Sequence, residues 1–503
     1  MFFRECSFPP HRLHDCAAKT SSIAFFLPGG RKLLMCGKYK FLVKKCQATV
    51  KFMSTVKIIK KKCTFRCTIF PNFCLFHCTF FLNFVYSTIQ FDFITYNINM
   101  MIDYTNLIEI SVKKIKNTKE TFVRSLDKKI NWNSRLIGIK GSRGCGKTTL
   151  LLQHLKNNHM DLVSSGKALF VSLDNIWFSK NSLLDLAESF SKNGGKILYL
   201  DEVHRYEDWP VYIKNIYDDY PELQVVFTGS SLLQILDARA DLSRRSVMYN
   251  MQGLSFREFL NIKTGNNFQE LSLEEILNNH FKNAFDICDK VKPFEYFDEY
   301  LKTGYYPFFM EGMDTYYMKL EETINMILDV ELPLLRKIDI AHISKIKKLL
   351  AIIAESSPFM LNASKLSGAM ELNRTTLLSY LKSLTDAKLI DSLFKNLKGV
   401  SSLQKPDKIF LENTNLMYLY QGTKVDEGNV RETFLVNQLS YNQTVEFSKE
   451  SDFFVNDKYT IECGEKSKTG EQIKTLENAF VAADGIEIGS GSKIPLWLFG
   501  FLY

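Results

Sequence analysis

The sequence predicts an α/β protein whose central part is a doubly wound parallel sheet, followed by a mainly helical region and a second α/β domain. Three observations favour the sheet. Short apolar runs alternate with helix-patterned runs, a glycine-rich loop (GSRGCGKTTL) joins the first apolar run to a helix, and an acidic pair ends a later run. Strands that alternate with helices form parallel sheets, and their functional residues gather at the carboxyl ends of the strands.

The glycine-rich loop matches a phosphate-binding pattern. It fits G-x-x-x-x-G-K-[ST], between the strand-like RLIGIK and the helix-like TLLLQHLKNN. Glycines let consecutive backbone N–H groups point into one concavity, and the following helix adds its positive N-terminal end. Lys147 is expected to reach the β- and γ-phosphates of ATP and to assist catalysis, and the Thr148 hydroxyl to hold Mg²⁺. The expected nucleotide-binding residues of the loop are Gly141, Gly144, Cys145, Gly146, Lys147, Thr148 and Thr149.

An acidic pair completes the expected P-loop site. In KILYLDEVHRYEDW, four apolar residues end at Asp201 and Glu202. Asp201 is expected to hold Mg²⁺ through water, and Glu202 to polarise the attacking water. A further apolar run, QVVFTGSS, ends at Thr228 and Ser230, where a polar side chain is expected to contact the γ-phosphate. The sequence therefore predicts a P-loop ATPase.

Charge is distributed unevenly along the 503 residues, a length that predicts about three domains. Residues 1–100 hold 15 of the 64 Lys and Arg and only 3 of the 55 Asp and Glu, a net charge of +12. The other residues carry 49 basic and 52 acidic side chains, a net charge of −3. The chain's formal charge of +9 therefore does not predict that the ATPase part binds nucleic acid.

The first hundred residues also differ in composition. Eight of the eleven cysteines precede residue 80, and residues 67–91 form a bilayer-length run without Asp, Glu, Lys or Arg. Polar residues within that run weaken a membrane interpretation, and no signal-peptide cleavage pattern is evident. We interpret residues 1–100 as a non-native or disordered upstream extension, with a natural start at Met100 or Met101. A membrane anchor and a zinc module remain alternatives, the latter from Cys63, Cys67, Cys74, Cys78 and His77.

Several stretches, taken in order, resemble one family. They are GSRGCGKTTL, FVSLDN, YLDEVHRYEDW, FTGSSLLQI, LSRR and GLSFREFL. They resemble the bacterial and archaeal AAA-type ATPases that carry a C-terminal domain of unknown function. The resemblance implies an ATPase domain over residues 101–260. It also implies that Arg245, which follows the sensor strand, contacts the γ-phosphate in cis or across a subunit boundary; the alternative is a solvated surface pair with Arg244.

Residues 261–342 are expected to be a helical linker region, and residues 343–398 a winged helix. The latter shows a helix, a short helix, a capped helix and then a strand and turn, with Asn362 and Asn373 at N-cap positions. It holds nine Lys and Arg against four acids. The third helix, which starts at Arg374, is therefore expected to enter the major groove of double-stranded DNA. The alternative is a protein-packing module.

Residues 399–503 resemble the core of PD-(D/E)xK nucleases, through NVRETFLVNQL and KESDFFVNDKYTIECGEKSKTGEQI. The resemblance implies a restriction-endonuclease-like α/β fold with Glu432 on the first helix, Asp452 at the start of a strand and Glu462 at the end of the next. It also implies a second divalent-metal site on Asp452 and Glu462.

This last stretch departs from the nuclease pattern at one position. Gly464 stands where the resemblance calls for a lysine, although Lys466 or Lys468 could reach back. Gln472 fits a position that orients substrate in some such folds. The domain is therefore expected to be nuclease-like in fold and inactive.

Two functional hypotheses follow. In the first, a cytoplasmic AAA-type ATPase uses Mg²⁺ and ATP to drive a conformational change in C-terminal domains that bind double-stranded DNA or an unknown protein partner. In the second, the protein is an ATP-dependent nuclease. A homo-oligomer is compatible with both. A membrane-tethered ATPase is a weaker alternative that depends wholly on residues 1–100.

Overall fold

The computed structural model describes residues 102–229, 242, 244–333, 339–395 and 405–503. It also gives the backbone of the antiparallel pair β1 (Ile23–Phe26) and β2 (Lys32–Met35). The chain divides into two compact units, Met1–Asn99 and Met100–Tyr503. The cysteines and histidine of the alternative zinc module, the apolar run 67–91 and Ser230 lie outside the described residues. Within the described ranges, no helix combines the length and the apolar character needed to cross a membrane.

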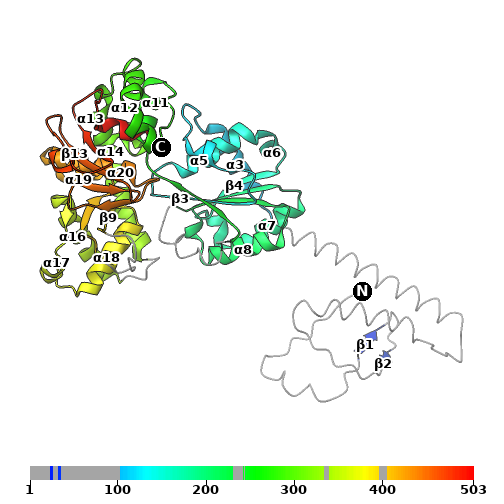
Figure 1. Ribbon diagram of the computed structural model, residues 1–503. Helices are drawn as coiled ribbons and strands as arrows, with labels where there is room; N and C mark the ends of the chain where they lie inside the picture. Colours follow the sequence, from blue (N-terminus) through cyan, green and yellow to red (C-terminus); the bar gives the residue numbers. More distant parts are fainter. Residues whose placement is uncertain are drawn as a thin grey trace. The chain divides into compact units, whose positions relative to one another are not determined.

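A five-stranded, wholly parallel sheet forms the first half of the second unit (Figure 1). In spatial order its strands are β4 (Ala168–Ser172), β5 (Ile197–Asp201), β6 (Gln224–Gly229), β3 (Leu136–Gly141) and β7 (Val247–Met251). The expected parallel sheet is confirmed. β7 was not predicted from the sequence, because its residues VMYNM are half exposed and lack the apolar run of the other strands.

Helices cover both faces of this sheet. Figure 1 shows α3, α5 and α6 on one face and α7 and α8 on the other. Their bounds are α3 (Thr105–Asn117), α4 (Leu126–Lys129), α5 (Lys147–Asn158), α6 (Met160–Ser164), α7 (Leu183–Lys192) and α8 (Trp209–Asp219).

Alternate residues of each strand point to opposite faces. Leu169, Leu198 and Val225 therefore join the cluster around α7 and α8. Their neighbours Phe170, Tyr199 and Val226 join the cluster around α5. Because both faces of these strands are buried, successive residues along each strand are apolar.

The residues after the sheet share one hydrophobic cluster that extends from Leu254 to Tyr503. The helices that open this part are α11 (Phe256–Thr264), α12 (Leu273–Cys288), α13 (Phe294–Glu299) and α14 (Tyr316–Met326). Between α13 and α14 lie the π-helical segment η5 (Tyr300–Gly304) and the 3-10 helix η6 (Pro307–Glu311), and the π-helical segment η7 (Ile327–Glu331) continues from α14. The helices α11 to α14 therefore pack into the C-terminal core, because their apolar sides are buried against it.

A helical segment with a small antiparallel sheet follows (Figure 1, yellow). Its elements are α16 (Ile340–Ser356), β8 (Phe359–Met360), α17 (Ala363–Ala369), α18 (Arg374–Asp386), β9 (Ile390–Leu393) and β10 (Lys408–Leu411), with the sheet order β8-β10-β9. The two expected N-caps are confirmed. Asn362 accepts a hydrogen bond from the Lys365 N–H, and Asn373 accepts one from the Thr376 N–H.

The chain ends in a mixed sheet with the order β11-β12-β13-β14-β15. β11 (Val445–Phe447), β12 (Phe453–Val455) and β13 (Tyr459–Gly464) pair antiparallel, whereas β14 (Ala479–Ala483) and β15 (Lys493–Pro495) continue in parallel from β13. The helices α19 (Thr414–Gln421) and α20 (Glu427–Leu439) precede the sheet, η9 (Glu471–Ile473) lies between β13 and β14, and η10 (Leu496–Phe501) ends it.

The GYYP corner (304–307) is buried. The Tyr305 N–H donates to Asn415 Oδ1 (2.9 Å), and the Tyr305 hydroxyl donates to Glu412 Oε1 (2.6 Å). Gly253 allows the Tyr305 ring to approach, since a Cβ at Gly253 would lie 2.3 Å from a ring carbon. The corner therefore joins the strand-to-helix connection after β7 to the turn after β10.

Candidate functional site

The glycine-rich loop lies where the sequence places it, between β3 and α5. Gly144 and Gly146 have positive φ values of 83° and 100°, which glycine adopts at little cost. Lys147, the first residue of α5, is buried, and its ammonium donates to the carbonyl oxygens of Gly141 (2.9 Å) and Ser142 (2.8 Å). The loop thus combines a concave backbone, a helix N-terminus and a cation, which suits a polyphosphate.

Asp201 is held between two hydroxyl groups. Thr148 Oγ1 donates to Asp201 Oδ2 (2.8 Å), and Thr228 Oγ1 donates to Asp201 Oδ1. Thr228 reaches Asp201 because β6 lies next to β5 in the sheet. The hydroxyl of Thr148 and the carboxylate of Asp201 are oxygen ligands of the kind that Mg²⁺ takes beside phosphates. The residues present therefore fit Mg²⁺ and ATP.

Glu202 faces a small cluster of charged and polar groups. Its backbone is in the left-handed region (φ 54°), which is uncommon outside glycine and is typical of strained functional sites. Its Oε2 lies 3.5 Å from His204 Nε2 and 3.9 Å from Arg143 Nη1. Burial, together with the charges of Arg205, Lys147 and Arg143, lowers the pKa of His204 to about 3. His204 is thus neutral, and Arg143 is the cation in these contacts.

Two residues from the C-terminal half also contact the loop, and sequence reasoning missed both. Glu331 Oε1 accepts a hydrogen bond from Arg143 Nη1 (2.7 Å). The Phe308 ring covers Gly144, where an added Cβ would lie 2.5 Å from a ring carbon. The nearest local signal in the sequence is the glycine and proline of GYYP (304–307), which precede Phe308 directly. Nothing in the local sequence singles out Glu331.

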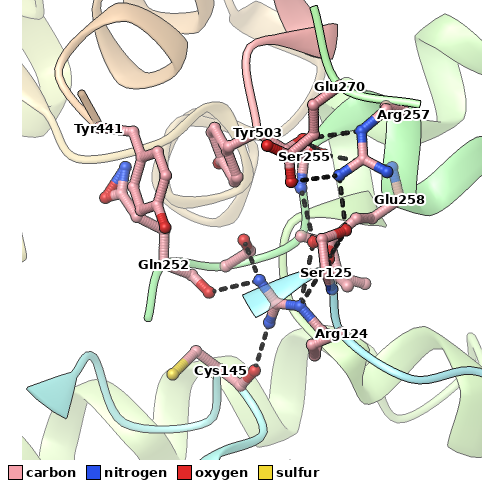
Figure 2. Close-up of polar contacts among 12 residues, drawn as sticks. Arg124, Ser125, Cys145, Gln252, Ser255, Arg257, Glu258, Glu270, Tyr441 and Tyr503 are labelled. Atoms are coloured by element: carbon pink, nitrogen blue, oxygen red, sulfur yellow. Dashed lines mark hydrogen bonds and ion pairs between the residues drawn. The ribbon is translucent and has the colours of Figure 1, made fainter. Parts of the chain in front are cut away.

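A buried arginine joins the loop to α11, the helix that follows the parallel sheet (Figure 2). Arg124 Nη1 donates to the Cys145 carbonyl (2.8 Å), and Nη2 donates to the carbonyls of Gln252 and Gly253 (2.9 Å each). Its Nε donates to both carboxylate oxygens of Glu258 (3.1 and 3.0 Å). Burial alone would raise the pKa of Glu258, but the charges of Arg124 and Arg257 outweigh it, so this pKa lies below its ordinary value. Glu258 therefore remains ionised in the core.

Other expected site residues lie apart from the loop. Arg245 donates from Nε and Nη2 to Asp218 on α8 (3.0 Å each). β7, which begins two residues after Arg245, runs parallel to β3, so Val247 lies beside Ile137 and Met251 beside Gly141. At about 3.3 Å per residue, Arg245 is roughly 20 Å from the loop, at the opposite edge of the sheet. Within one chain Arg245 therefore does not reach the phosphate site, which corrects the in-cis expectation.

The carboxylates expected in the C-terminal sheet come together. Asp452 precedes β12, and its Oδ2 accepts the Cys463 N–H of β13 (2.7 Å). Glu462 on β13 is 1% exposed, and the Lys468 ammonium lies 2.9 Å from its Oε1. Burial raises the pKa of Asp452, and the nearby charge of Glu462 raises it further. In the described ranges, however, no group of three or more His, Cys, Asp or Glu is placed to hold a metal ion.

Of the two lysines that follow Gly464 closely, Lys468 and not Lys466 lies against Glu462. A Cβ at Gly464 would lie 2.9 Å from Lys468 Cγ, so the lysine stem occupies the space above the glycine. The ammonium is at ion-pair distance from Glu462, although the direction is not that of a good hydrogen bond. Lys466 instead lies near Gly485, and its carbonyl accepts from Lys493.

Two family models match the chain. Residues 133–260 match an AAA domain, and residues 294–425 match a domain of unknown function, DUF8612. The first match contains the whole glycine-rich loop, the Asp201–Glu202 pair and all five strands of the parallel sheet. The second contains η5, η6, η7 and the segment from α16 to α19, and ends before the C-terminal mixed sheet.

A curated relative and several solved structures are similar to the chain, among them the three that follow. An uncharacterised protein of Methanocaldococcus jannaschii is 26% identical over 393 residues, which are 72% of this chain and 82% of that protein. The structure of C. elegans PCH-2 is 18% identical with a TM-score of 0.19, over 32% of this chain and 46% of that one. The structure of the Aeropyrum pernix ORC1 protein in complex with DNA is 12% identical with a TM-score of 0.27, over 61% of this chain and 91% of that one. Scores this low carry no functional argument, and the match at residues 133–260, with its parallel sheet, supports an AAA-type P-loop domain.

Proposed function

We propose that the protein binds ATP with Mg²⁺ and hydrolyses it. The observation that carries this proposal is the convergence of Lys147, Thr148 and Asp201 at the carboxyl edge of the parallel sheet. Lys147 would leave the carbonyls of its own loop and bind the β- and γ-phosphates. Thr148 and Asp201 would hold Mg²⁺, which neutralises phosphate charge when bound.

Glu202 is the proposed general base. It would accept a proton from a water molecule as that water's oxygen bonds to the γ-phosphorus and the bond to the bridging oxygen of ADP breaks. The Glu202 N–H is fixed by Thr228 Oγ1 (3.3 Å), so the hydroxyl that positions Asp201 also positions Glu202. Arg245, at the opposite edge and partly exposed, is proposed to act only across a subunit boundary, on the nucleotide of a second copy of the chain.

The ATPase cycle is proposed to act on a winged helix over residues 343–398 that binds double-stranded DNA. The element order from α16 to β10 and the exposure of Arg374, Ser379 and Lys382 on α18 support this. An exposed helix with basic residues can contact phosphates and base edges in the major groove. A protein partner in place of DNA is the alternative output.

ATP turnover by the full chain, measured with and without double-stranded DNA, tests the proposal. We expect turnover in the wild type, and its loss in Lys147→Ala and Glu202→Gln. DNA is expected to raise turnover in the wild type but not in Arg374→Ala/Lys382→Ala, whereas Lys282→Ala/Lys290→Ala, which removes two exposed lysines near α12, keeps the response. Wild-type turnover that survives Lys147→Ala would rule out this site. Turnover indifferent to DNA would point to a protein partner.

A second function, an ATP-dependent nuclease, is favoured by the position of Lys468. Its ammonium lies 2.9 Å from Glu462 although residue 464 is glycine, so Lys468 would supply, from four residues later, the lysine that the nuclease pattern requires. Asp452 and Glu462 would hold the divalent metal, and Lys468 would orient the attacking water. An inactive domain, with glycine at position 464, is the competing expectation.

Nicking of supercoiled plasmid with Mg²⁺ or Mn²⁺ distinguishes the two functions. If the domain cuts DNA, Asp452→Ala and Lys468→Met abolish nicking, while Lys466→Met, which changes the neighbouring lysine, leaves it intact. The absence of metal-dependent nicking in the wild type, with and without ATP, would leave the ATP-driven switch as the function.

A further inference from the structure

A carboxylate from the C-terminal half lies in the ATPase site. Glu331, the last residue of η7, is 3% exposed. Its Oε1 is 2.7 Å from Arg143 Nη1 in the phosphate loop and 3.8 Å from His204 Nε2. It belongs to the DUF8612 match and not to the AAA match. A residue outside the ATPase domain thus holds a cation of the phosphate loop.

A second contact from the same region reinforces the first. Phe308 in η6 covers Gly144, and its ring stacks on Tyr306 (centroids 5.5 Å apart, planes inclined by 11°). Pro307 lies 3.8 Å from the position of a Cβ at Gly146. The loop is therefore bounded by η6 on one side and held by Glu331 from η7 through Arg143.

The charges at this contact conflict with an incoming triphosphate. Arg143 already faces two carboxylates, Glu331 at 2.7 Å and Glu202 at 3.9 Å. His204 is neutral and supplies no balancing charge. A terminal phosphate brings up to two further negative charges to the loop, and the planar fork of an arginine binds phosphate oxygens well. Glu331 and the terminal phosphate therefore compete for Arg143.

We propose that Glu331 is a positioning residue that senses the terminal phosphate of ATP. In the closed pair, Glu331 holds Arg143; when ATP binds, Arg143 turns to the terminal phosphate and Glu331 is released. ADP lacks that phosphate and leaves the pair closed. This inference rests on the proposed function only in requiring that the loop binds nucleotide.

The segment η7, which carries Glu331, contacts α16 at the start of the expected winged helix. Asp329 in η7 pairs with Lys347 on α16 (2.7 Å). Leu328 and Leu332, on either side of Glu331, are buried in the same cluster as Ile346 and Leu350 of α16. A shift of η7 therefore moves the surface against which α16 packs. The Arg143–Glu331 pair is the contact through which the nucleotide state reaches residues 343–398.

The test compares affinities of the full chain for ADP and for a non-hydrolysable ATP analogue. Glu331→Gln keeps the shape of the side chain and removes its charge. We expect it to tighten binding of the analogue roughly five- to twentyfold, a typical allosteric coupling, and to change ADP binding less than about twofold. Glu322→Gln, which neutralises an exposed glutamate on α14, is the matched control and changes neither affinity. Glu331→Asp keeps the charge and is expected to restore most of the wild-type ratio.

A double variant of Arg143 and Glu331 shows whether Glu331 acts by competing with phosphate for Arg143 or only by supporting the fold. Arg143→Gln removes the shared cation, so adding Glu331→Gln to it is expected to change the ratio of the two affinities by less than about twofold. Equal changes for ADP and the analogue in Glu331→Gln would overturn the proposal. If the wild type binds neither nucleotide, the proposed function itself fails.

Hydrogen exchange of the wild type provides a second measurement that needs no variant. Residues 327–333 are expected to lose protection when the ATP analogue binds and to keep it with ADP. Unchanged exchange in a chain that binds the analogue would also overturn the proposal.

Discussion

Arg124 and Glu258, 134 residues apart in sequence, form a buried ion pair in which one guanidinium nitrogen donates to both carboxylate oxygens. The same guanidinium binds the Cys145 carbonyl of the phosphate loop and two carbonyls after β7. Glu258 also closes the capping box of α11 with Ser255. One side chain therefore joins the segment before the sheet, the nucleotide loop and the first helix of the C-terminal half.

Removing the cation of this pair is expected to be severe. Arg124→Met leaves the Glu258 charge buried, and we expect the free energy of unfolding to fall by about 3–5 kcal/mol, as for other broken buried pairs. Urea unfolding measures this. Arg124→Met/Glu258→Gln removes the unpaired charge and should recover part of the loss. Lys319→Met, which breaks the exposed pair with Glu311, is the control and should have little effect. Equal losses in the single and double variants would contradict the role of charge.

Replacing glycine by alanine is expected to have opposite effects on stability at Gly253 and at Gly368. At Gly253 a Cβ would lie 2.3–2.5 Å from three carbons of the Tyr305 ring, so Gly253→Ala is expected to lower stability by roughly 1–3 kcal/mol through overpacking. At Gly368, in helix α17, no atom lies within 4 Å of the added Cβ. Gly368→Ala should therefore raise stability by about 0.5–1 kcal/mol. Thermal or urea unfolding distinguishes the two, and a stable Gly253→Ala protein would contradict the close approach of Tyr305.

The free energy of unfolding is expected to depend on pH through the ionisation of Glu412. Burial and the nearby charge of Asp391 raise the pKa of Glu412 to about 7, against the opposing effects of Lys388 and of hydrogen bonds from Tyr305 and Asn413. Between the unfolded value near 4.3 and the folded value, the native state binds more protons than the unfolded state. The contribution of Glu412 to the free energy of unfolding is therefore largest at low pH and falls as pH rises to about 7, by roughly 3 kcal/mol at most.

Unfolding curves of the wild type and Glu412→Gln between about pH 5 and pH 8 isolate this contribution. The variant is always neutral at this position, so its stability relative to the wild type should increase with pH. Glu427→Gln, at an exposed position of α20, is the control and should follow the wild type. A constant difference between wild type and Glu412→Gln across this range would mean that Glu412 does not titrate there.

Thr228 is expected to affect turnover more than binding. Thr228→Val keeps the side-chain shape but removes the hydroxyl that holds Asp201 and the Glu202 N–H. We expect kcat for ATP to fall about tenfold, the equivalent of one lost hydrogen bond in the transition state, with little change in nucleotide affinity. Thr433→Val is the matched control, because Thr433 is also fully buried and its hydroxyl has no hydrogen-bond partner in the described structure. An equal fall in both variants would indicate a general loss of stability.

Much of the P-loop site could be predicted from sequence because its residues lie directly at the ends of strands and helices that the local sequence indicates. The positions of Lys147 and Thr148 follow from a loop between a strand and a helix, and Asp201 follows from the end of a buried strand. The N-caps Asn362 and Asn373 are equally local. Local sequence could not show how far Arg245 lies from the loop, because that distance depends on the direction of β7. It also could not show the burial of α11 to α14, which depends on a sheet that follows them by more than a hundred residues.

The sequence by itself determined the parallel sheet, the nucleotide loop and the acidic pair, since each is written in a short run of residues with its own period or motif. Only the tertiary structure decided what surrounds them. Contacts such as Glu331 with Arg143, Phe308 over Gly144 and Lys468 with Glu462 depend on how separate elements pack, and packing is set by apolar burial shared across the chain. A local pattern cannot encode such contacts. The same glutamate or lysine, in the same local sequence, would be a solvated surface charge if no other element packed against it.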